Sequence, residues 1–316
     1  MDAVYATILE DGCKFLPGDE NKWRELFEPH YLEFSKDIEV VKDQVYGPND
    51  RNALDVYIPA GEATNRTVMM YVHGGGFHSG DKRWSEKCYA NIGYTFAAQG
   101  IVTVVINHRL VPNIVYPEGA EDIQLAREWI HSNIGSHKFG NGDINKVILF
   151  GHSSGAAHIA MNLYAAGDPE RVSRDPLNPP VAGAIYIDPP CWYDRRKPKR
   201  QEVIRHYYGS DAEEVWGPKS VVGLFNGLPD DSPLLDSTIL PIYLGASEYE
   251  VPETSEAVVR FLNAYRARSK PAGTLPFFHV LPKHNHVSDV LSIGTPDTEQ
   301  RDVVLKFIAR CLENRK

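Results

Sequence analysis

Buried apolar runs alternate with helical patterns along most of the chain, and this alternation constrains the fold more than any other feature of the sequence. The segments 67–72 (TVMMYV) and 101–107 (IVTVVIN) are continuous apolar runs rich in β-branched residues, as expected of strands buried on both faces. Comparable runs occur at 146–150, 182–188, 240–246 and 277–282. Strands that alternate with helices in this way predict a mostly parallel sheet with helices on both faces.

Helical patterns occupy the stretches between these strands. Helices are expected at 84–98, 117–134, 154–167, 253–268 and 298–313. In the second of them, Ile123, Ala126 and Ile130 fall on one helical face. Ahead of the alternating region, 38–47 and 52–59 are expected to form a pair of strands joined by a turn at 47–50.

Two segments depart from this alternation. Residues 1–37 form a polar N-terminal arm, expected to be helical near 20–34. Residues 189–236 hold prolines, aromatic residues and charges without a clear strand, and are expected to be an insertion above the sheet. Because no linker and no internal repeat divides the chain, we predict one domain over 1–316, with the arm 1–37 and a cap formed by 189–236.

Charge and composition exclude several kinds of partner. The 316 residues carry a formal net charge of −9, which repels phosphate backbones and argues against nucleic acid. The basic run 194–202 has no interleaved aromatic residues and is expected to be a solvated loop. No stretch approaches the roughly 20 apolar residues needed to span a bilayer. The start lacks a secretory signal and the four cysteines are scattered, so we predict a cytoplasmic protein without a membrane partner.

The segment 149–158 (LFGHSSGAAH) follows a predicted buried strand and begins a predicted helix. Within it, residues 151–155 match G-x-S-x-G, the pattern of a nucleophile elbow. The glycines leave room where a sharp turn brings strand and helix together. The serine hydroxyl then lies at the helix N-terminus, where the helix dipole favours negative charge. Ser153 is therefore the predicted catalytic nucleophile.

A catalytic serine needs a base, and on such a sheet the histidine comes after the serine in the chain. The segment 282–286 (PKHNH) is expected to be a loop directly after the last strand, where a base can reach over the carboxyl end of the sheet. His284 and His286 both qualify, and His286 is preferred. An H-x-H pair can also bind a metal, but no third ligand is apparent nearby, so neither a metal nor a cofactor is predicted.

Residues 73–77 (HGGGF) place three glycines directly after a predicted strand. The tetrahedral intermediates of acyl transfer carry an oxyanion, which needs fixed N–H donors that no side chain obstructs. The HGGG pattern after a strand supplies such donors in esterases. Gly75 and Gly76 are the predicted donors, with the backbone N–H of Ser154 as the third.

The combined motifs resemble a known family. HGGGF (73–77), NHRLVP (107–112), YPEGAED (116–122), GHSSGA (151–156) and SPLL (232–235) look like the hormone-sensitive-lipase-like branch of the α/β-hydrolases. The resemblance implies an eight-stranded sheet, a Ser–acid–His triad, an HGGG oxyanion hole and a cap that shapes the acyl pocket. Most members are carboxylesterases, and arylformamidases that hydrolyse N-formylkynurenine form a neighbouring branch. The chain departs from the family at His108, where a tyrosine is usual.

The resemblance also bears on the acid of the triad, for which this chain offers only glutamates where the family has an aspartate. Three of them, Glu248, Glu250 and Glu253, lie in SEYEVPE after the strand 240–246. Related sequences place the acid nine residues after the proline that opens this strand, which gives Glu250. A rival count of three residues after the glycine at the strand end gives Glu248. Glu250 is preferred.

These features predict a serine hydrolase that cleaves a small-molecule carboxylic ester through an acyl-enzyme. Two alternatives on the same fold stay open: an arylformamidase-type amide hydrolase, and a biosynthetic enzyme that forms a lactone or eliminates. Phe77 and Trp192 are predicted to contact the substrate. The sequence is also compatible with a homodimer.

Overall fold

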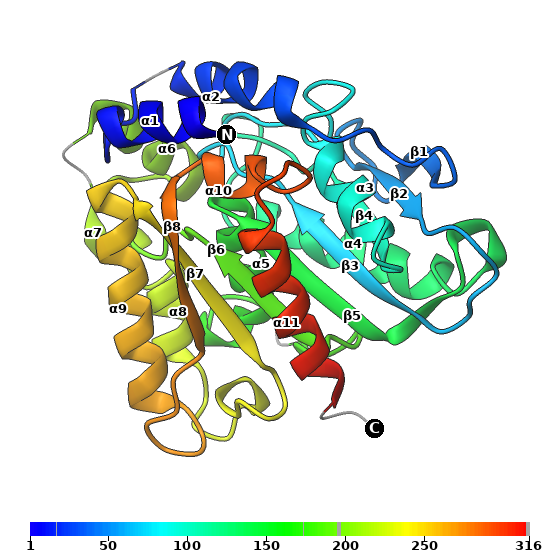
Figure 1. The fold of residues 1–316 in the computed structure, drawn as a ribbon. Helices are drawn as coiled ribbons and strands as arrows, with labels where there is room; N and C mark the ends of the chain where they lie inside the picture. The colour runs from blue at the N-terminus through cyan, green and yellow to red at the C-terminus, as the bar shows by residue number, and fades with distance from the viewer. Residues whose placement is uncertain (17, 173, 195–196, 314–316) are drawn as a thin grey trace.

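An eight-stranded sheet forms the centre of the molecule, with the strand order β1-β2-β4-β3-β5-β6-β7-β8 (Figure 1). The computed structural model describes residues 1–16, 18–172, 174–194 and 197–313. The strands are β1 (Glu39–Val45), β2 (Ala53–Ile58), β3 (Arg66–Val72), β4 (Val102–Ile106), β5 (Gly142–His152), β6 (Gly183–Ile187), β7 (Ile242–Tyr249) and β8 (Phe277–Asn285). β2 pairs antiparallel with β1 and β4, and the pairs from β4–β3 through to β7–β8 are parallel. The predicted mostly parallel sheet is confirmed.

Helices cover both faces of this sheet. They are α1 (Asp2–Asp11), α2 (Asp19–Phe27), α3 (Ala90–Ala97), α4 (Glu118–Asn133), α5 (Ser154–Leu163), α6 (Pro198–Tyr208), α7 (Glu213–Trp216), α8 (Val221–Gly227), α9 (Pro252–Arg268), α10 (Ser288–Leu291) and α11 (Glu299–Glu313). Short 3-10 turns are η1 (Glu28–His30), η2 (His137–Phe139), η3 (Ala165–Gly167) and η4 (Pro233–Leu235). The helix expected from residue 84 begins only at Ala90. Its first residues form a turn instead, in which the Ser85 hydroxyl accepts a hydrogen bond from the Cys88 N–H at 2.9 Å.

Alternate residues of the central strands enter two hydrophobic cores, one on each face of the sheet. In β3, Met70 packs in the core that contains α4, α5, α8 and α9, whereas Met69 and Tyr71 pack in the core that contains α3 and α11. This period of two is what a strand imposes on its side chains. Because both faces of the sheet are buried, the residues that point to either face are apolar. This explains the continuous apolar runs in the sequence.

The N-terminal arm packs on the second of these cores. Trp23 and Phe27 of α2 and Ile8 of α1 are fully buried there, and α2 lies against α10 at the same end of the molecule (Figure 1). The helix expected near 20–34 ends earlier, at Phe27, and continues only as η1. Pro29 lies in that turn and lacks the N–H that a longer α-helix would need.

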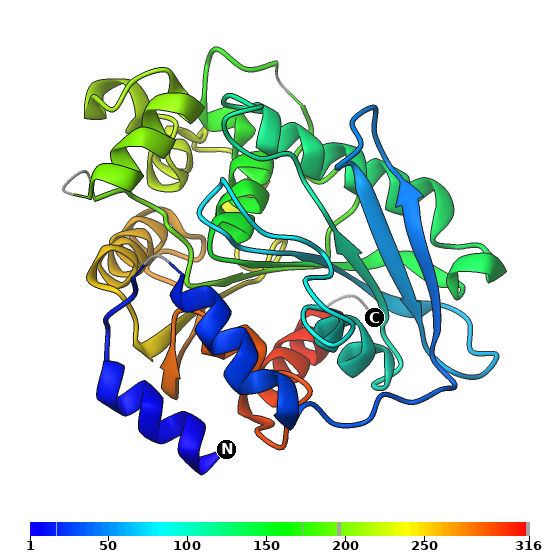
Figure 2. The ribbon, with the colours of Figure 1, turned by 90° about the horizontal axis from the view of Figure 1, so that it is seen from above.

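The insertion 189–236 consists of α6, α7, α8 and η4, which pack together on one side of the molecule (Figure 2). Tyr207, Trp216 and Leu224 bury their side chains in the same core as α5. The basic run 194–202 was expected to be a solvated loop, but α6 begins inside it, and Arg200 forms an ion pair of 2.8 Å with Glu253. Arg195 and Arg196 lie outside the described residues.

Within the described residues, no helix is long and apolar enough to cross a bilayer.

Candidate active site

The serine of the G-x-S-x-G pattern occupies a strained turn between β5 and α5. Ser153 has φ +50° and ψ −126°, a conformation that non-glycine residues rarely adopt. A side chain at Gly151 would overlap the backbone of Ala156, and one at Gly155 would overlap the carbonyl groups of Val72 and His73. The two glycines are therefore required by the close packing of the turn, as the sequence predicted.

The candidate base lies directly after β8. His286 Nε2 is 2.9 Å from Ser153 Oγ, so the imidazole can accept the hydroxyl hydrogen. The loop predicted at 282–286 is wrong, because β8 continues through Asn285 and His286 is the first residue beyond it. His284 points elsewhere: it is buried and hydrogen-bonded to Ser288 Oγ at 2.9 Å and to Asp297 at 2.8 Å.

The candidate acid lies directly after β7. Glu250 Oε2 accepts a hydrogen bond of 2.8 Å from His286 Nδ1, and the Glu250 side chain is only 1% exposed. Burial raises the pKa of Glu250 to about 8. The rival Glu248 is exposed and accepts a hydrogen bond from the Lys283 N–H. Of the three glutamates considered, the structure brings only Glu250 to His286, because Glu253 is bound by Arg200.

The glycine loop after β3 approaches the serine most closely at Gly74, where an added Cβ would lie 2.9 Å from Ser153 Cβ. Gly75 and Gly76 have φ +126° and +61°, in the region that favours glycine. A Cβ at Gly75 would overlap the Ser79 carbonyl group. Part of the requirement for glycine therefore comes from the tight turn itself. From the sequence, the glycines were explained only by the approach of an anion to the backbone. Ser154 is the first residue of α5, where backbone N–H groups have no partner within the helix.

Three buried histidines lie behind this loop and were not predicted as a group. The His73 ring stacks on His108 with centroids 4.5 Å apart, and His108 meets His158 edge-on at 4.9 Å. All three side chains are fully buried, and burial lowers the pKa of His73 and His158 well below the ordinary 6.5. His108 stands where the family usually has a tyrosine, and that departure was the only signal of this stack in the sequence.

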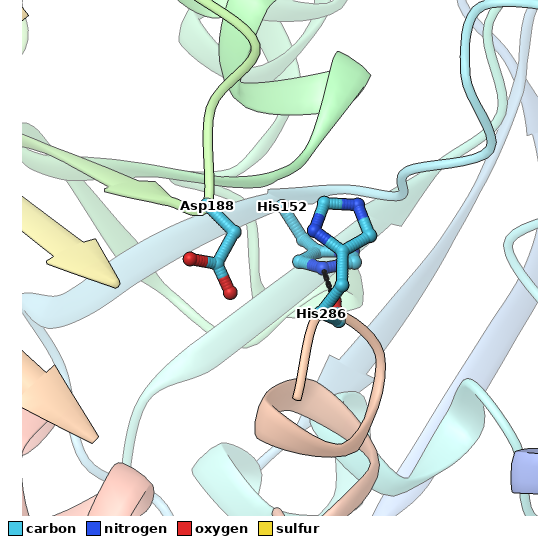
Figure 3. A group of neighbouring side chains, drawn as sticks. All are labelled: His152, Asp188 and His286. Atoms are coloured by element: carbon cyan, nitrogen blue, oxygen red, sulfur yellow. Dashed lines mark hydrogen bonds between the residues drawn. The ribbon is translucent and has the colours of Figure 1, made fainter. Parts of the chain in front are cut away.

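A polar cluster beside the triad was also missed. His152, Asp188 and His286 each offer a possible ligand atom within 4.8 Å of the others, and they come from β5, the end of β6 and the end of β8 (Figure 3). His152 Nε2 donates a hydrogen bond of 2.6 Å to the His286 carbonyl oxygen. Since Ser153 and Glu250 already occupy the two ring nitrogens of His286, this ring has no nitrogen left for a metal.

The residues predicted to contact substrate lie in different surroundings. Phe77 is 2% exposed and stacks on Tyr207 with centroids 5.4 Å apart. Trp192 lies in a groove of about 1150 Å³ between the insertion and α9, and the Arg260 guanidinium covers its ring at 3.8 Å. Phe15, between α1 and α2, meets the His286 ring edge-on at 6.0 Å. Substrate contact by Phe77 and Trp192 stays a prediction.

Known proteins share both the sequence motifs and the fold. Residues 54–174 match the family model described as BD-FAE. A probable carboxylesterase 13 from Arabidopsis thaliana is 30% identical over 166 residues, which are 48% of this chain and 50% of that protein. Esterase B from Lactobacillus rhamnosis has a TM-score of 0.73 at 16% identity, covering 99% of this chain and 96% of its own. An esterase of the bacterial hormone-sensitive lipase family has a TM-score of 0.64 at 17% identity, over 99% and 97% of the two chains.

The sheet, the elbow and these similarities show that the chain has the α/β-hydrolase fold. Within that class, its similarity is to the hormone-sensitive-lipase-like carboxylesterases, so the resemblance inferred from the sequence is confirmed. The chain spans half or less of the length of the curated relatives it matches.

Proposed function

We propose that this protein is a carboxylic ester hydrolase that works through a covalent acyl-enzyme, with Ser153 as nucleophile, His286 as base and Glu250 as acid. The observation that carries the proposal is the unbroken run of hydrogen bonds from Ser153 Oγ through both ring nitrogens of His286 to Glu250. Such a run lets the imidazole take the serine proton while the carboxylate holds the ring in one tautomer.

In the first half of the reaction, Ser153 Oγ attacks the ester carbonyl carbon as its proton passes to His286 Nε2. The carbonyl oxygen becomes an oxyanion, which the N–H groups of Gly75, Gly76 and Ser154 stabilise. The C–O bond to the alcohol then breaks, and the imidazolium gives its proton to the departing alcohol. An acyl group remains on Ser153.

In the second half, water attacks the acyl carbon and His286 accepts the water proton. A second oxyanion forms on the same donors and collapses, the bond to Ser153 Oγ breaks, and the serine regains its proton from His286. Glu250 accepts the hydrogen bond from His286 Nδ1 in both halves, and its ionised form stabilises the imidazolium that forms in each. The residues 189–236 act as the cap over this site within one domain that includes the arm 1–37.

The test is a panel of p-nitrophenyl esters of increasing acyl chain length, run beside N-formylkynurenine. Hydrolysis of the esters with a burst of p-nitrophenol is the expected result, because acyl-enzymes release alcohol before acid. If the protein hydrolyses N-formylkynurenine and none of the esters, it is an amide hydrolase that uses the same residues. Homodimerisation and a cytoplasmic location stay predictions of the sequence.

A further inference from the structure

The proposed mechanism uses Glu250 but gives no role to the buried carboxyl group beside it. Asp188 directly follows β6, has φ +47° and is fully buried. Its Oδ1 accepts a hydrogen bond of 3.0 Å from the Ser247 N–H, and its Oδ2 accepts one of 2.7 Å from Ser247 Oγ. These contacts fix the Asp188 carboxyl group against Ser247 near the end of β7, three residues before Glu250.

Asp188 is the middle member of a row of three buried carboxyl groups. It lies within hydrogen-bonding reach of Glu250 on one side and of Asp289 of α10 on the other, and all three side chains are buried. Two ionised carboxylates cannot hydrogen-bond to each other, because both are acceptors. Each of the two links therefore needs one proton, which leaves one negative charge on the three groups.

The surroundings decide where that charge lies. The titratable groups facing Asp188 come from four elements: Glu250 after β7, Tyr243 within β7, Asp289 of α10, His286 after β8 and His152 of β5. Backbone or hydroxyl donors reach all three carboxyl groups, but only Glu250 accepts a hydrogen bond from the His286 ring, with Nδ1 at 2.8 Å. Burial raises the pKa of all three carboxyl groups, which agrees with fewer than three negative charges in the cluster.

We propose that Asp188 and Asp289 are neutral carboxylic acids, and that Asp188 donates a hydrogen bond to the Glu250 carboxylate and so positions it against His286. The proposal rests on the proposed function only in the role given to Glu250. Asp188 is a positioning residue, because it acts on the reaction only through Glu250. Its hydrogen bond stabilises a glutamate charge that burial alone would neutralise, and no proton needs to move along the row during turnover.

The variants Asp188→Asn and Asp188→Ala separate this role from simple packing. An asparagine keeps a donor toward Glu250, and Ser247 Oγ can turn its hydrogen to the Asn285 carbonyl oxygen at 3.2 Å, which frees it to accept from the new amide. Alanine removes the donor. Since hydrogen bonds to charged groups are the strong ones, Asp188→Ala is expected to lower kcat ~10- to 100-fold with little change in KM. Asp188→Asn is expected to rescue most of that loss.

The pH profile of kcat/KM supplies the decisive comparison. If Asp188 is neutral, Asp188→Asn changes no charge and the acid limb of the profile stays in place. If Asp188 carries the charge, the same substitution removes an anion beside His286 and moves the acid limb to lower pH, on the order of one unit. That movement, or an Asp188→Asn enzyme as impaired as Asp188→Ala, would overturn the proposal.

Infrared spectroscopy tests the proton on Asp188 without any substrate. At neutral pH, the infrared spectrum of wild type should contain a carbonyl stretch of a protonated carboxyl group that the spectrum of Asp188→Asn lacks. The matched control Glu248→Gln, at an exposed carboxylate in the same segment, should lose only a carboxylate band. Because Asp289 keeps its own proton, the test is whether Asp188→Asn has less protonated-carboxyl absorption than wild type; an unchanged protonated band contradicts the proposal even if no ester is found to be cleaved. Failure of the ester panel alone would leave this result unaffected.

Discussion

Replacing Glu250 by glutamine removes the negative charge that faces His286 while keeping the shape of the side chain. The hydrogen bond from His286 Nδ1 to Glu250 Oε2 is 2.8 Å long, and both side chains are largely buried, at 15% and 1% exposed. The substitution therefore changes the charge next to the imidazole without opening a cavity, so the loss that follows is a loss of electrostatic stabilisation and of tautomer control.

The expected loss can be worked out from this geometry. Opposite charges about 4 Å apart interact by about 4 kcal/mol at an effective dielectric constant near 20. Because each 1.36 kcal/mol corresponds to a factor of ten, removal of the carboxylate charge should lower kcat about 10³-fold. A glutamine can also present its amide N–H₂ to Nδ1, which favours the tautomer that cannot accept the Ser153 proton. We therefore expect a total loss of ~10³- to 10⁴-fold for Glu250→Gln.

The assay is steady-state hydrolysis of the best p-nitrophenyl ester, with Glu248→Gln as the matched control. Glu248 lies two residues away and its side chain contacts the Lys283 N–H, so its replacement should cost less than tenfold. Urea unfolding of both variants checks that the fold is retained. A large loss in Glu248→Gln with a small one in Glu250→Gln would refute the assignment of the acid.

Three further substitutions test other parts of the site. Ser153→Ala should lower kcat by about 10⁵- to 10⁶-fold while the protein stays folded. A fluorophosphonate probe should label wild type only, and a labelled variant would assign the nucleophile elsewhere. Gly76→Ala should lower kcat ~10²- to 10³-fold at nearly constant KM, because oxyanion donors act mainly in the transition state. A raised KM at unchanged kcat would instead make 73–77 a substrate-binding loop. Burial lowers the pKa of His158 well below 6.5, so below pH 6.5 the unfolded chain binds a proton there that the folded chain does not. The free energy of unfolding therefore falls as the pH drops below 6.5, and His158→Gln should reduce that slope by up to about 1.4 kcal/mol per pH unit. An unchanged slope in urea titrations at several pH values would show that the folded protein protonates His158.

Much of the fold could be predicted from the sequence, because the strands are buried on both faces. A short apolar run rich in β-branched residues, such as 67–72, favours a buried strand. The observed β3 differs from this run by one residue. Boundaries were less predictable where polar side chains offered the backbone another partner. The turn held by the Ser85 hydroxyl makes α3 begin later than predicted. The pairing of β8 with β7 extends the strand to Asn285, whereas the sequence predicted a loop over 282–286.

The candidate triad was predictable to the extent that each member lay near a local pattern. Ser153 belongs to a motif with fixed glycines, and His286 and Glu250 each follow a recognisable strand. The choice between neighbours two residues apart needed the structure, because such residues leave a strand on the same side and the point where the strand ends decides which one reaches the site. His284 and Glu248 lie one strand period before His286 and Glu250, and neither reaches the serine.

Asp188 and Asp289 carry no local pattern, and their importance comes from the topology of the sheet. β5, β6, β7 and β8 are parallel neighbours, so their carboxyl ends meet, and Ser153, Asp188, Glu250 and His286 each follow one of them. A sequence motif can identify a residue only where local backbone geometry restricts its neighbours, as the elbow does for Ser153. Two carboxyl groups brought together by the end of β6 and by α10 impose no such restriction on the residues beside them in the chain. The protons proposed on Asp188 and Asp289 depend on burial and on neighbouring groups in the folded site, which no local sequence pattern encodes.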